Sequence, residues 1–130
     1  MTQASQDERY RIEISVESRY LPDQSDADQA RYAFAYSVRI LNTGTVAAQL
    51  ISRHWLIEDE NGEIVEVRGL GVVGRQPLLR PGEHFDYTSG SQLATSVGTM
   101  RGSYFFVAED GHRFDAEISP FTLAMPRTLH

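Results

Sequence analysis

Apolar and polar residues alternate with a period of two through much of the chain. In residues 11–17, every second position is isoleucine or valine and the others are charged or hydroxyl residues. This pattern is typical of a β-strand with one face toward a core and the other toward water. In residues 32–40 the second face is mostly small instead of charged, which indicates a central, covered strand.

Further strands are predicted by the same alternation. They lie at about 49–58, 63–67, 85–87, 100–108 and 114–118, with an extended tail at 120–123. Three turn signals separate some of them. Asn61-Gly62 and Asp110-Gly111 predict hairpins, the first with positive φ at both turn positions, and Pro81-Gly82 predicts a type II turn.

Helical spacing is absent from the sequence pattern. No stretch of 11 residues repeats apolar positions at i, i+3, i+4 and i+7. The acidic segment 22–30 is predicted to be a loop, and 68–82 a long connection. Seven or eight strands with turns between them predict an all-β, antiparallel two-sheet β-sandwich. We expect one domain over 1–130, with flexible tails at 1–8 and 127–130.

Composition narrows the function classes without naming one. The chain has 130 residues, 41% of them hydrophobic, which fits a single globular core. Cysteine is absent, all basic residues are arginine, and the net charge is −6. These features exclude a disulfide scaffold, a thiol nucleophile and a Schiff-base lysine. They also exclude non-specific electrostatic binding of nucleic acid. No targeting or membrane segment is evident, so we expect a cytoplasmic protein.

Several short motifs stand in a fixed order along most of the chain. They are Arg53-His54-Trp55, 59–62, 69–77, Leu79-Arg80-Pro81-Gly82, 85–90 and Met100-Arg101-Gly102 with Tyr104. Together these motifs resemble the bacterial ApaG family, whose domain is also called DUF525. The resemblance covers about residues 10–126.

The resemblance carries expectations about fold and role. It implies a fibronectin type III-like (immunoglobulin-like) sandwich, in agreement with the predicted strands. Domains of this family also occur in some eukaryotic F-box proteins and in a polymerase-delta-interacting protein, where they are thought to bind other proteins. The bacterial members have no established biochemical activity. The resemblance therefore favours a non-enzymatic module with a protein partner, no cofactor and no membrane or nucleic-acid role.

A glycine motif offers an alternative, nucleotide or pyrophosphate binding. Gly69, Gly71 and Gly74 have the GxGxxG spacing, followed by Arg75. In dinucleotide-binding folds this motif needs a helix that opens directly after it, because the helix N-terminus holds the phosphate. Pro77 and Pro81 leave no room for such a helix. The basic segment 68–80 contains no acid, so backbone amides and guanidinium groups could still hold an anion.

Aromatic and basic residues suggest where a protein partner could bind. Three consecutive aromatics, Tyr104, Phe105 and Phe106, place large rings on both faces of one strand. Either both faces are covered or one ring is exposed, and aromatic and arginine residues dominate interface hot spots. The predicted interaction surface is Arg53, His54, Arg101 and Tyr104.

Other chemistry has weaker support from the sequence. No two histidines have the i, i+2 spacing of ligands on one strand face, and no metal-ligand residues are assigned. A divalent-metal role stays as a second alternative, assembled from His54, His84, His112 or His130 with Asp86 or Glu109. Hydroxyls at 88–91 lack a GxSxG elbow, and the carboxylates at 58–66 surround a projecting hairpin. No catalytic residue is predicted.

Overall fold

Eight β-strands make up most of the structure, a computed structural model that describes residues 7–126. The strands are β1 (Ile12–Tyr20), β2 (Tyr32–Asn42), β3 (Ala48–Asp59), β4 (Ile64–Leu70), β5 (Leu78–Leu79), β6 (His84–Leu93), β7 (Val97–Ala108) and β8 (Arg113–Ala124). Three single-turn 3₁₀ helices are η1 (Glu8–Tyr10), η2 (Pro22–Gln24) and η3 (Ala27–Gln29). The described part of the chain contains no α-helix, as the alternation predicted.

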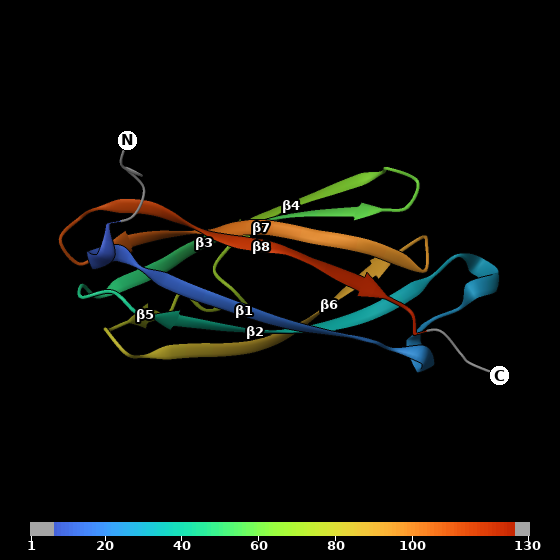
Figure 1. Ribbon diagram of the computed structural model, residues 1–130, viewed down its shortest axis with the longest axis horizontal. Helices are drawn as coiled ribbons and strands as arrows, with labels where there is room; N and C mark the ends of the chain where they lie inside the picture. The colour runs from blue at the N-terminus through green and yellow to red at the C-terminus, as the bar shows by residue number, and fades with distance from the viewer. Residues whose placement is uncertain (1–6, 127–130) are drawn as a thin grey trace.

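Two antiparallel sheets pack face to face (Figure 1). One has the order β1-β2-β6, and the other has the order β4-β3-β7-β8, with β5 also paired to β3. The predicted antiparallel two-sheet sandwich is therefore confirmed. Strand β2 is central in its sheet, as its small second face indicated.

The core lies between the sheets and is rich in aromatic side chains. Its largest fully buried residues include Phe34, Tyr104, Phe106, Leu50 and Met100. Trp55 packs edge-on against Tyr36, Tyr104 and Phe121. Every second residue of β2 and β7 faces this core, so the period-two pattern of the sequence is the direct cause of the layered packing.

Several boundaries differ from those predicted. Strand β4 continues through Arg68 and Gly69 to Leu70 instead of ending at Val67. The two-residue strand β5 was missed, because two residues are too few to show alternation. The extended tail at 120–123 is the second half of β8, where a register shift opposite Met100 and Gly102 accommodates Pro120.

Both predicted hairpins form, but the turn type predicted at Asn61-Gly62 was wrong. Only Gly62 has a positive φ, of 82°, and its amide bonds to the carbonyl of Asp59. This is the three-residue loop in which a type I turn is followed by a left-handed glycine. The carboxylate of Asp59 accepts from the amides of Asn61 and Glu63, and so stabilises this turn.

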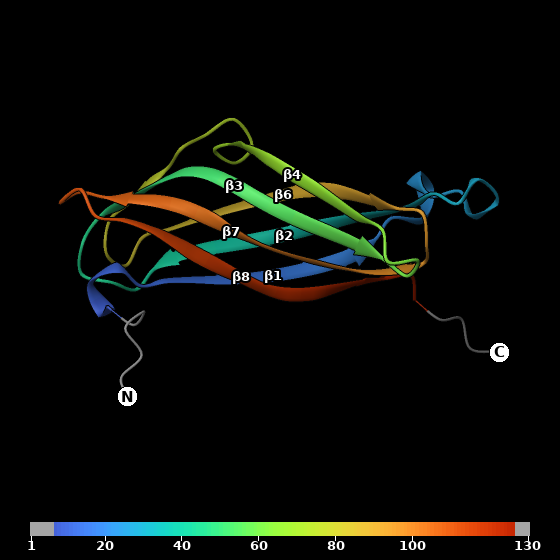
Figure 2. The same ribbon diagram turned by 90° about the horizontal axis from the view of Figure 1, so that it is seen from above.

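The edge of β3 is shared by two strands. Ser52 pairs with Leu70 of β4, and Gln49 pairs with Leu78 of β5. The chain thus leaves this edge after β4 and returns to it at β5; the intervening segment projects from the side of the sandwich in Figure 2. A bulge at Ile51 lets its carbonyl accept from the amide of Gly71 and from Nε2 of Gln76.

The expected flexible tails fall largely outside the described residues, which exclude 1–6 and 127–130. Of the predicted N-terminal tail, Asp7 and Glu8 are described, and they belong to the cap and first turn of η1. Segment 22–30 contains η2 and η3, short turns within the predicted loop. No helix within residues 7–126 is long and apolar enough to cross a membrane.

Candidate functional site

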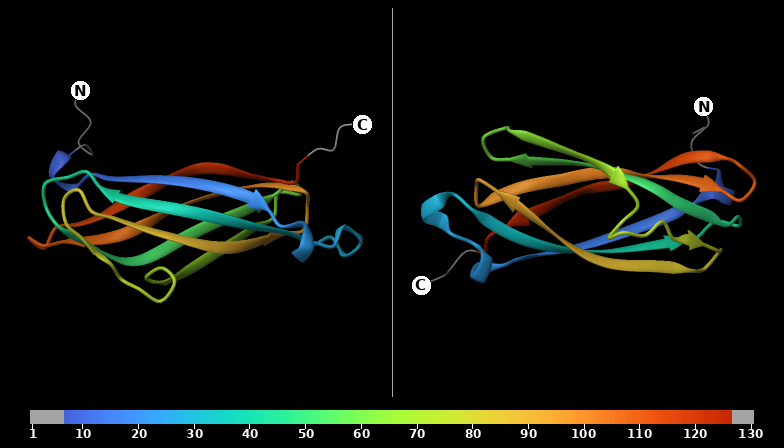
Figure 3. Two further views of the ribbon diagram at one scale, coloured as in Figure 1. Left: turned by 90° about the horizontal axis from the view of Figure 1, so that it is seen from below. Right: turned by 180° about the vertical axis from the view of Figure 1, so that it is seen from behind.

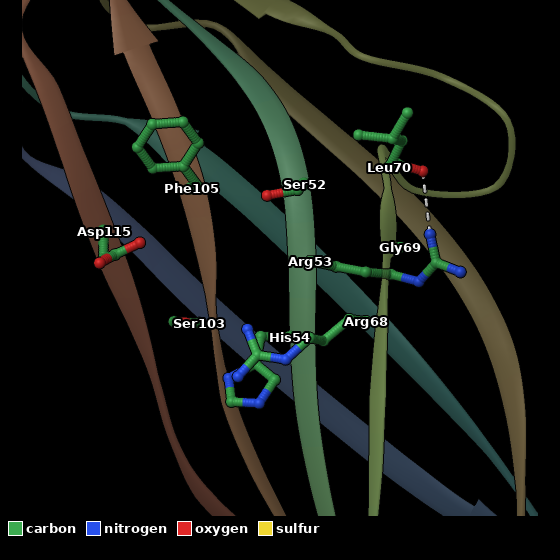
Figure 4. Close-up of a pocket in the computed structure, with 9 residues that line it drawn as sticks. All are labelled: Ser52, Arg53, His54, Arg68, Gly69, Leu70, Ser103, Phe105 and Asp115. Carbon is green, nitrogen blue, oxygen red and sulfur yellow. Dashed lines mark hydrogen bonds between the residues drawn. The ribbon is translucent and has the colours of Figure 1, made fainter.

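A shallow hollow of about 560 Å³ lies on the outer face of the larger sheet (Figure 4). Its lining comes from four strands, and consists of Ser52, Arg53, His54, Arg68, Gly69, Leu70, Ser103, Phe105 and Asp115. Tyr104 and Phe106 point into the core and are fully buried. Because side chains alternate along β7, Phe105 between them points to the outer face and is half-buried. A partly exposed aromatic ring thus lies beside basic and hydroxyl side chains.

The carboxylate of Glu66 contacts both His54 and Arg68 at the β4 side of the hollow. Its Oε2 lies 2.6 Å from Nε2 of His54 and 3.0 Å from a guanidinium nitrogen of Arg68. These two contacts, His54 first, lower the pKa of the Glu66 carboxyl below its usual range. Figure 4 shows the guanidinium of Arg68 reaching toward the His54 ring. The carboxylate therefore fixes both side chains at the rim of the hollow.

Arg53 is held between the hollow and the edge of the sandwich. Its Nη1 donates to the carbonyls of Leu70, at 3.0 Å, and Gly71, at 2.9 Å. A Cβ at Gly69 would lie 2.7–2.8 Å from the same guanidinium, so any other residue there would push the end of the Arg53 side chain out of this position. The first glycine of the motif thus serves the packing of Arg53.

The rest of the glycine motif forms a tight turn. Val72 and Arg75 exchange both backbone hydrogen bonds, and the two residues between them, Val73 and Gly74, have positive φ of 43° and 78°. This is the geometry of a type I′ turn, which is strained for valine and natural for glycine. Gly71 has φ 63°, and a Cβ there would lie 2.2 Å from the carbonyl oxygen of Arg75.

Three backbone amides of this segment already have acceptors. Those of Gly71, Val72 and Arg75 donate to the carbonyls of Ile51, Arg75 and Val72 respectively. No helix begins after the motif within the described residues. Gly69, Gly71, Gly74 and Arg75 are therefore close together, as predicted, but their arrangement is accounted for by the turn and by Arg53.

The predicted interaction surface is only partly on one face. His54 and Arg101 point outward, and Arg101 pairs with Glu58 at 3.2 Å. The prediction for Tyr104 was wrong. This residue is 0% exposed, so it cannot belong to a contact surface. Strand β7 turns Tyr104 inward, on the same face of the sheet as its β3 partner Arg53, and the outward ring of the aromatic run is the partly exposed ring of Phe105.

Tyr104 instead forms a buried phenol pair with Tyr87. Their hydroxyl oxygens lie 2.5 Å apart, joining β7 to β6 across the core. Burial raises the pKa of both phenols well above the usual value of 10. Both hydroxyls therefore stay protonated at neutral pH, and their role is structural.

Strand β4 carries exposed apolar residues that the sequence analysis missed. Ile64, Val65 and Leu70 are 51%, 58% and 74% exposed, followed by Val73 and Leu78 in the next segment. The adjacent pair Ile64-Val65 was a usable signal, because neighbours on a strand point to opposite faces and one must leave the core. Among residues 7–126, the one other large apolar residue in this exposed class is Met125.

The histidines do not come together. His54 lies at the hollow, His84 lies 3.3 Å from Asp86 on the other sheet, and His112 stacks on Tyr10. His130 lies outside the described residues. Within 7–126, no group of three histidine or carboxylate residues is placed to hold a metal ion.

Comparison with known proteins identifies the family. Residues 22–108 match the model of the ApaG domain. The ApaG protein of Thiobacillus denitrificans is 66% identical over 94% of this chain and 96% of its own length. That of Methylobacillus flagellatus is 61% identical, over 97% and 99%. The crystal structure of a Bordetella pertussis protein superposes with a TM-score of 0.90, at 58% identity, covering 93% of this chain and 98% of that one. The chain therefore belongs to the ApaG family.

Proposed function

We propose that this protein is a non-enzymatic binding module that takes a protein partner in the hollow around Phe105. The observation that carries the proposal is a partly exposed aromatic ring, Phe105, in a hollow on the outer face of the sheet beside Arg68 and His54. Aromatic and arginine side chains contribute most of the energy at protein interfaces, especially at the centre of a contact patch. Leu70, 74% exposed at the rim, would add apolar area to the contact.

The chemistry of the hollow favours binding over catalysis. His54 and Arg68 are both committed to Glu66, and the hollow is shallow and open on one side of the sheet. General acid–base catalysis and oxyanion stabilisation both work best where water is excluded. A mixed surface of aromatic, cationic and hydroxyl groups is instead suited to a polypeptide with acidic and apolar side chains.

A photo-crosslinking amino acid at position 105 tests the proposal directly. The variant is expressed in cells, irradiated, and its adducts are identified by mass spectrometry. We expect one protein adduct at position 105 and none at position 17, an exposed glutamate on β1 of the other sheet. The purified partner should then bind the wild-type chain at least tenfold more tightly than Phe105→Asp. Equal adducts at both positions, or equal affinity of the two chains, would contradict the proposal.

Phosphate binding at Gly69, Gly71, Gly74 and Arg75 stays a prediction with its own test. Pyrophosphate and nucleotides are titrated to millimolar concentration while the amide resonances of the three glycines are followed. Saturable shifts confined to these residues would support a phosphate-binding role. Because the amide of Gly71 already donates to the carbonyl of Ile51 and that of Arg75 to the carbonyl of Val72, we expect no such shifts.

A further inference from the structure

The outer edge of β4 is an unpaired strand edge. Among the described residues, β4 pairs only with β3, and it forms the border of its sheet (Figure 3). Hydrogen bonds from Gly71 to Ile51 and from Asp59 to Glu63 fix the alternation of the ladder between these strands. Backbone groups at odd-numbered positions of β4 therefore point to β3, and those at even-numbered positions point away from it.

Four residues thus present backbone groups to the open edge: Ile64, Glu66, Arg68 and Leu70. The carbonyl of Leu70 is taken by Arg53. An open edge with exposed apolar side chains is a template for another strand. Exposed strand edges in proteins are commonly protected from pairing by lysine, proline or a β-bulge. Strand β4 contains no lysine or proline, and its pairing with β3 has no bulge.

The sequence of β4 is complementary to itself when two copies run antiparallel. With Val67 on a two-fold axis, Glu66 lies opposite Arg68 of the second copy, and Arg68 opposite its Glu66. Ile64 lies opposite Leu70 in the same way. All four belong to the even-numbered set, so this register also matches the backbone groups that point outward.

Neighbouring registers are disfavoured by charge. Moving one strand by two residues places Glu66 opposite Glu66 of the second copy, or Arg68 opposite Arg68. Directly opposed like charges destabilise an antiparallel pair, whereas opposite charges stabilise it. Moving by a single residue would mismatch the outward backbone groups. One register therefore satisfies the charges, the apolar residues and the hydrogen bonds together.

We propose that two copies of this chain associate through β4, antiparallel about a two-fold axis at Val67. The β4-β3-β7-β8 paths of the two sheets then join into one continuous run of eight strands, with β5 still paired to β3 in each copy. Because the axis is perpendicular to the sheet, both Phe105 hollows open on the same side. Ile64 of the second copy adjoins Leu70 at the rim of each hollow. The association stands on the strand edge, so it is independent of whether a partner protein binds the hollow.

Charge exchange tests the register. Dimer dissociation constants of the full chain are measured by analytical ultracentrifugation. Glu66→Arg alone and Arg68→Glu alone each create two like-charge pairs, and we expect at least about tenfold weaker association of each. An equimolar mixture of the two variants restores opposite charges, and should recover a heterodimer of near wild-type affinity. Glu17→Arg, on β1 of the other sheet, should leave the constant unchanged.

A cysteine at the axis gives a second, geometric test. Val67 would face its own copy in a non-hydrogen-bonded pair, in which Cα atoms lie about 4.5 Å apart, within disulfide range. The natural chain has no cysteine. Val67→Cys should therefore form a covalent dimer under mild oxidation, while Val65→Cys, which lies opposite Gly69 of the second copy, should not. Fluorescence of Trp55 checks that each variant is folded.

Two results would overturn the proposal. One is a wild-type chain that stays monomeric at millimolar concentration. The other is a dimer in which the mixed charge variants are no tighter than each alone and Val65→Cys crosslinks as readily as Val67→Cys. Neither result bears on binding at the hollow, because crosslinking at position 105 is read out separately.

Discussion

The guanidinium of Arg53 rests on the backbone of Gly69. Its nitrogen atoms lie 2.7 and 2.8 Å from where a Cβ of residue 69 would be, and its Nη1 donates to the carbonyls of Leu70 and Gly71. The side chain of Arg53 therefore passes over the backbone of β4 at Gly69. Its guanidinium donates hydrogen bonds to the carbonyls of Leu70 and Gly71, where the strand ends. The glycine at this next-to-last position of β4 leaves space for the guanidinium, which a Cβ would displace.

Replacement of this glycine should displace Arg53. We expect Gly69→Ala to lower the free energy of unfolding by about 1–3 kcal/mol, because the guanidinium loses its carbonyl acceptors. Urea denaturation followed by Trp55 fluorescence measures the change. In an Arg53→Met background the same substitution should cost less than half as much.

The matched control is Gly90, also in a strand. A Cβ there would meet only the carbonyl of Phe34 at 3.6 Å, an ordinary contact. Gly90→Ala should therefore be neutral or stabilising by up to about 1 kcal/mol. Equal losses at positions 69 and 90 would refute the role assigned to Arg53.

Asn42 ties together three segments at one end of the sandwich. It is the buried polar residue of the described part of the chain. Its Nδ2 donates to the carbonyls of Val46 and Leu79, and its Oδ1 accepts from the amide of Gly44. Asn42→Ala removes three hydrogen bonds to backbone groups, and should lower the free energy of unfolding by roughly 3 kcal/mol.

An exposed asparagine provides the comparison. Asn61→Ala, at the tip of the β3–β4 hairpin, should cost less than about 1 kcal/mol. Calorimetric melting of both variants separates the two effects. A loss at position 42 no greater than that at position 61 would show that the network around Asn42 is dispensable.

Stability should fall in alkaline solution because of Tyr87 and Tyr104. Burial raises the pKa of both phenols in the folded state, whereas in the unfolded chain they ionise near pH 10. Their contribution is complete below pH 10 and is lost as pH rises above it, since only the unfolded state then releases protons. Denaturation midpoints between pH 8 and 12 measure this loss.

Replacing both phenols tests the assignment. In Tyr87→Phe/Tyr104→Phe the decline above pH 10 should be shallower, even if the double variant is less stable at pH 8. Tyrosinate absorbance should rise together with unfolding in the wild type. A decline of equal slope in both proteins would place its cause elsewhere in the chain.

The turn between Val72 and Arg75 contains a strained backbone conformation at Val73, which a substitution can relieve. Val73 has φ 43° and is 55% exposed, so its side chain contributes little burial to offset an unfavourable backbone. Val73→Asn should raise the free energy of unfolding by about 1 kcal/mol, because asparagine adopts this conformation readily. Val72→Asn, at a fully buried neighbour, should instead cost roughly 2–4 kcal/mol. Thermal melts of the two variants give the comparison.

The fold could be predicted from the sequence because its causes are local. Alternation in β1, β2 and β7 and the glycines at 62, 82 and 111 are each visible within a few residues. They determine which segments are strands and where the chain turns. The two residues of β5 were missed because their pairing with Ala48 and Gln49 is a long-range contact with no local pattern.

The candidate site was harder to predict because alternation shows which side chains share one face of a strand but not which face is turned to the core. A bulge at Ile51 also shifts the alternation within β3, so that Leu50 and Trp55 both point inward. From sequence alone, either Tyr104 or Phe105 could have been the outward ring. The glycine motif was equally ambiguous, because a turn and a phosphate site both favour glycine.

The excursion that leaves β3 after Leu70 and returns at Leu78 has a practical consequence for engineering. Both of its ends are anchored to β3, by the amide of Gly71 on Ile51 and by the side chain of Gln49 on the carbonyl of Gln76. Extra residues inserted between Val73 and Gly74 would lengthen only the tip, at a small entropic cost that grows slowly with length. This turn is therefore a natural position for displaying a foreign peptide, or an affinity tag, without altering the register of either sheet.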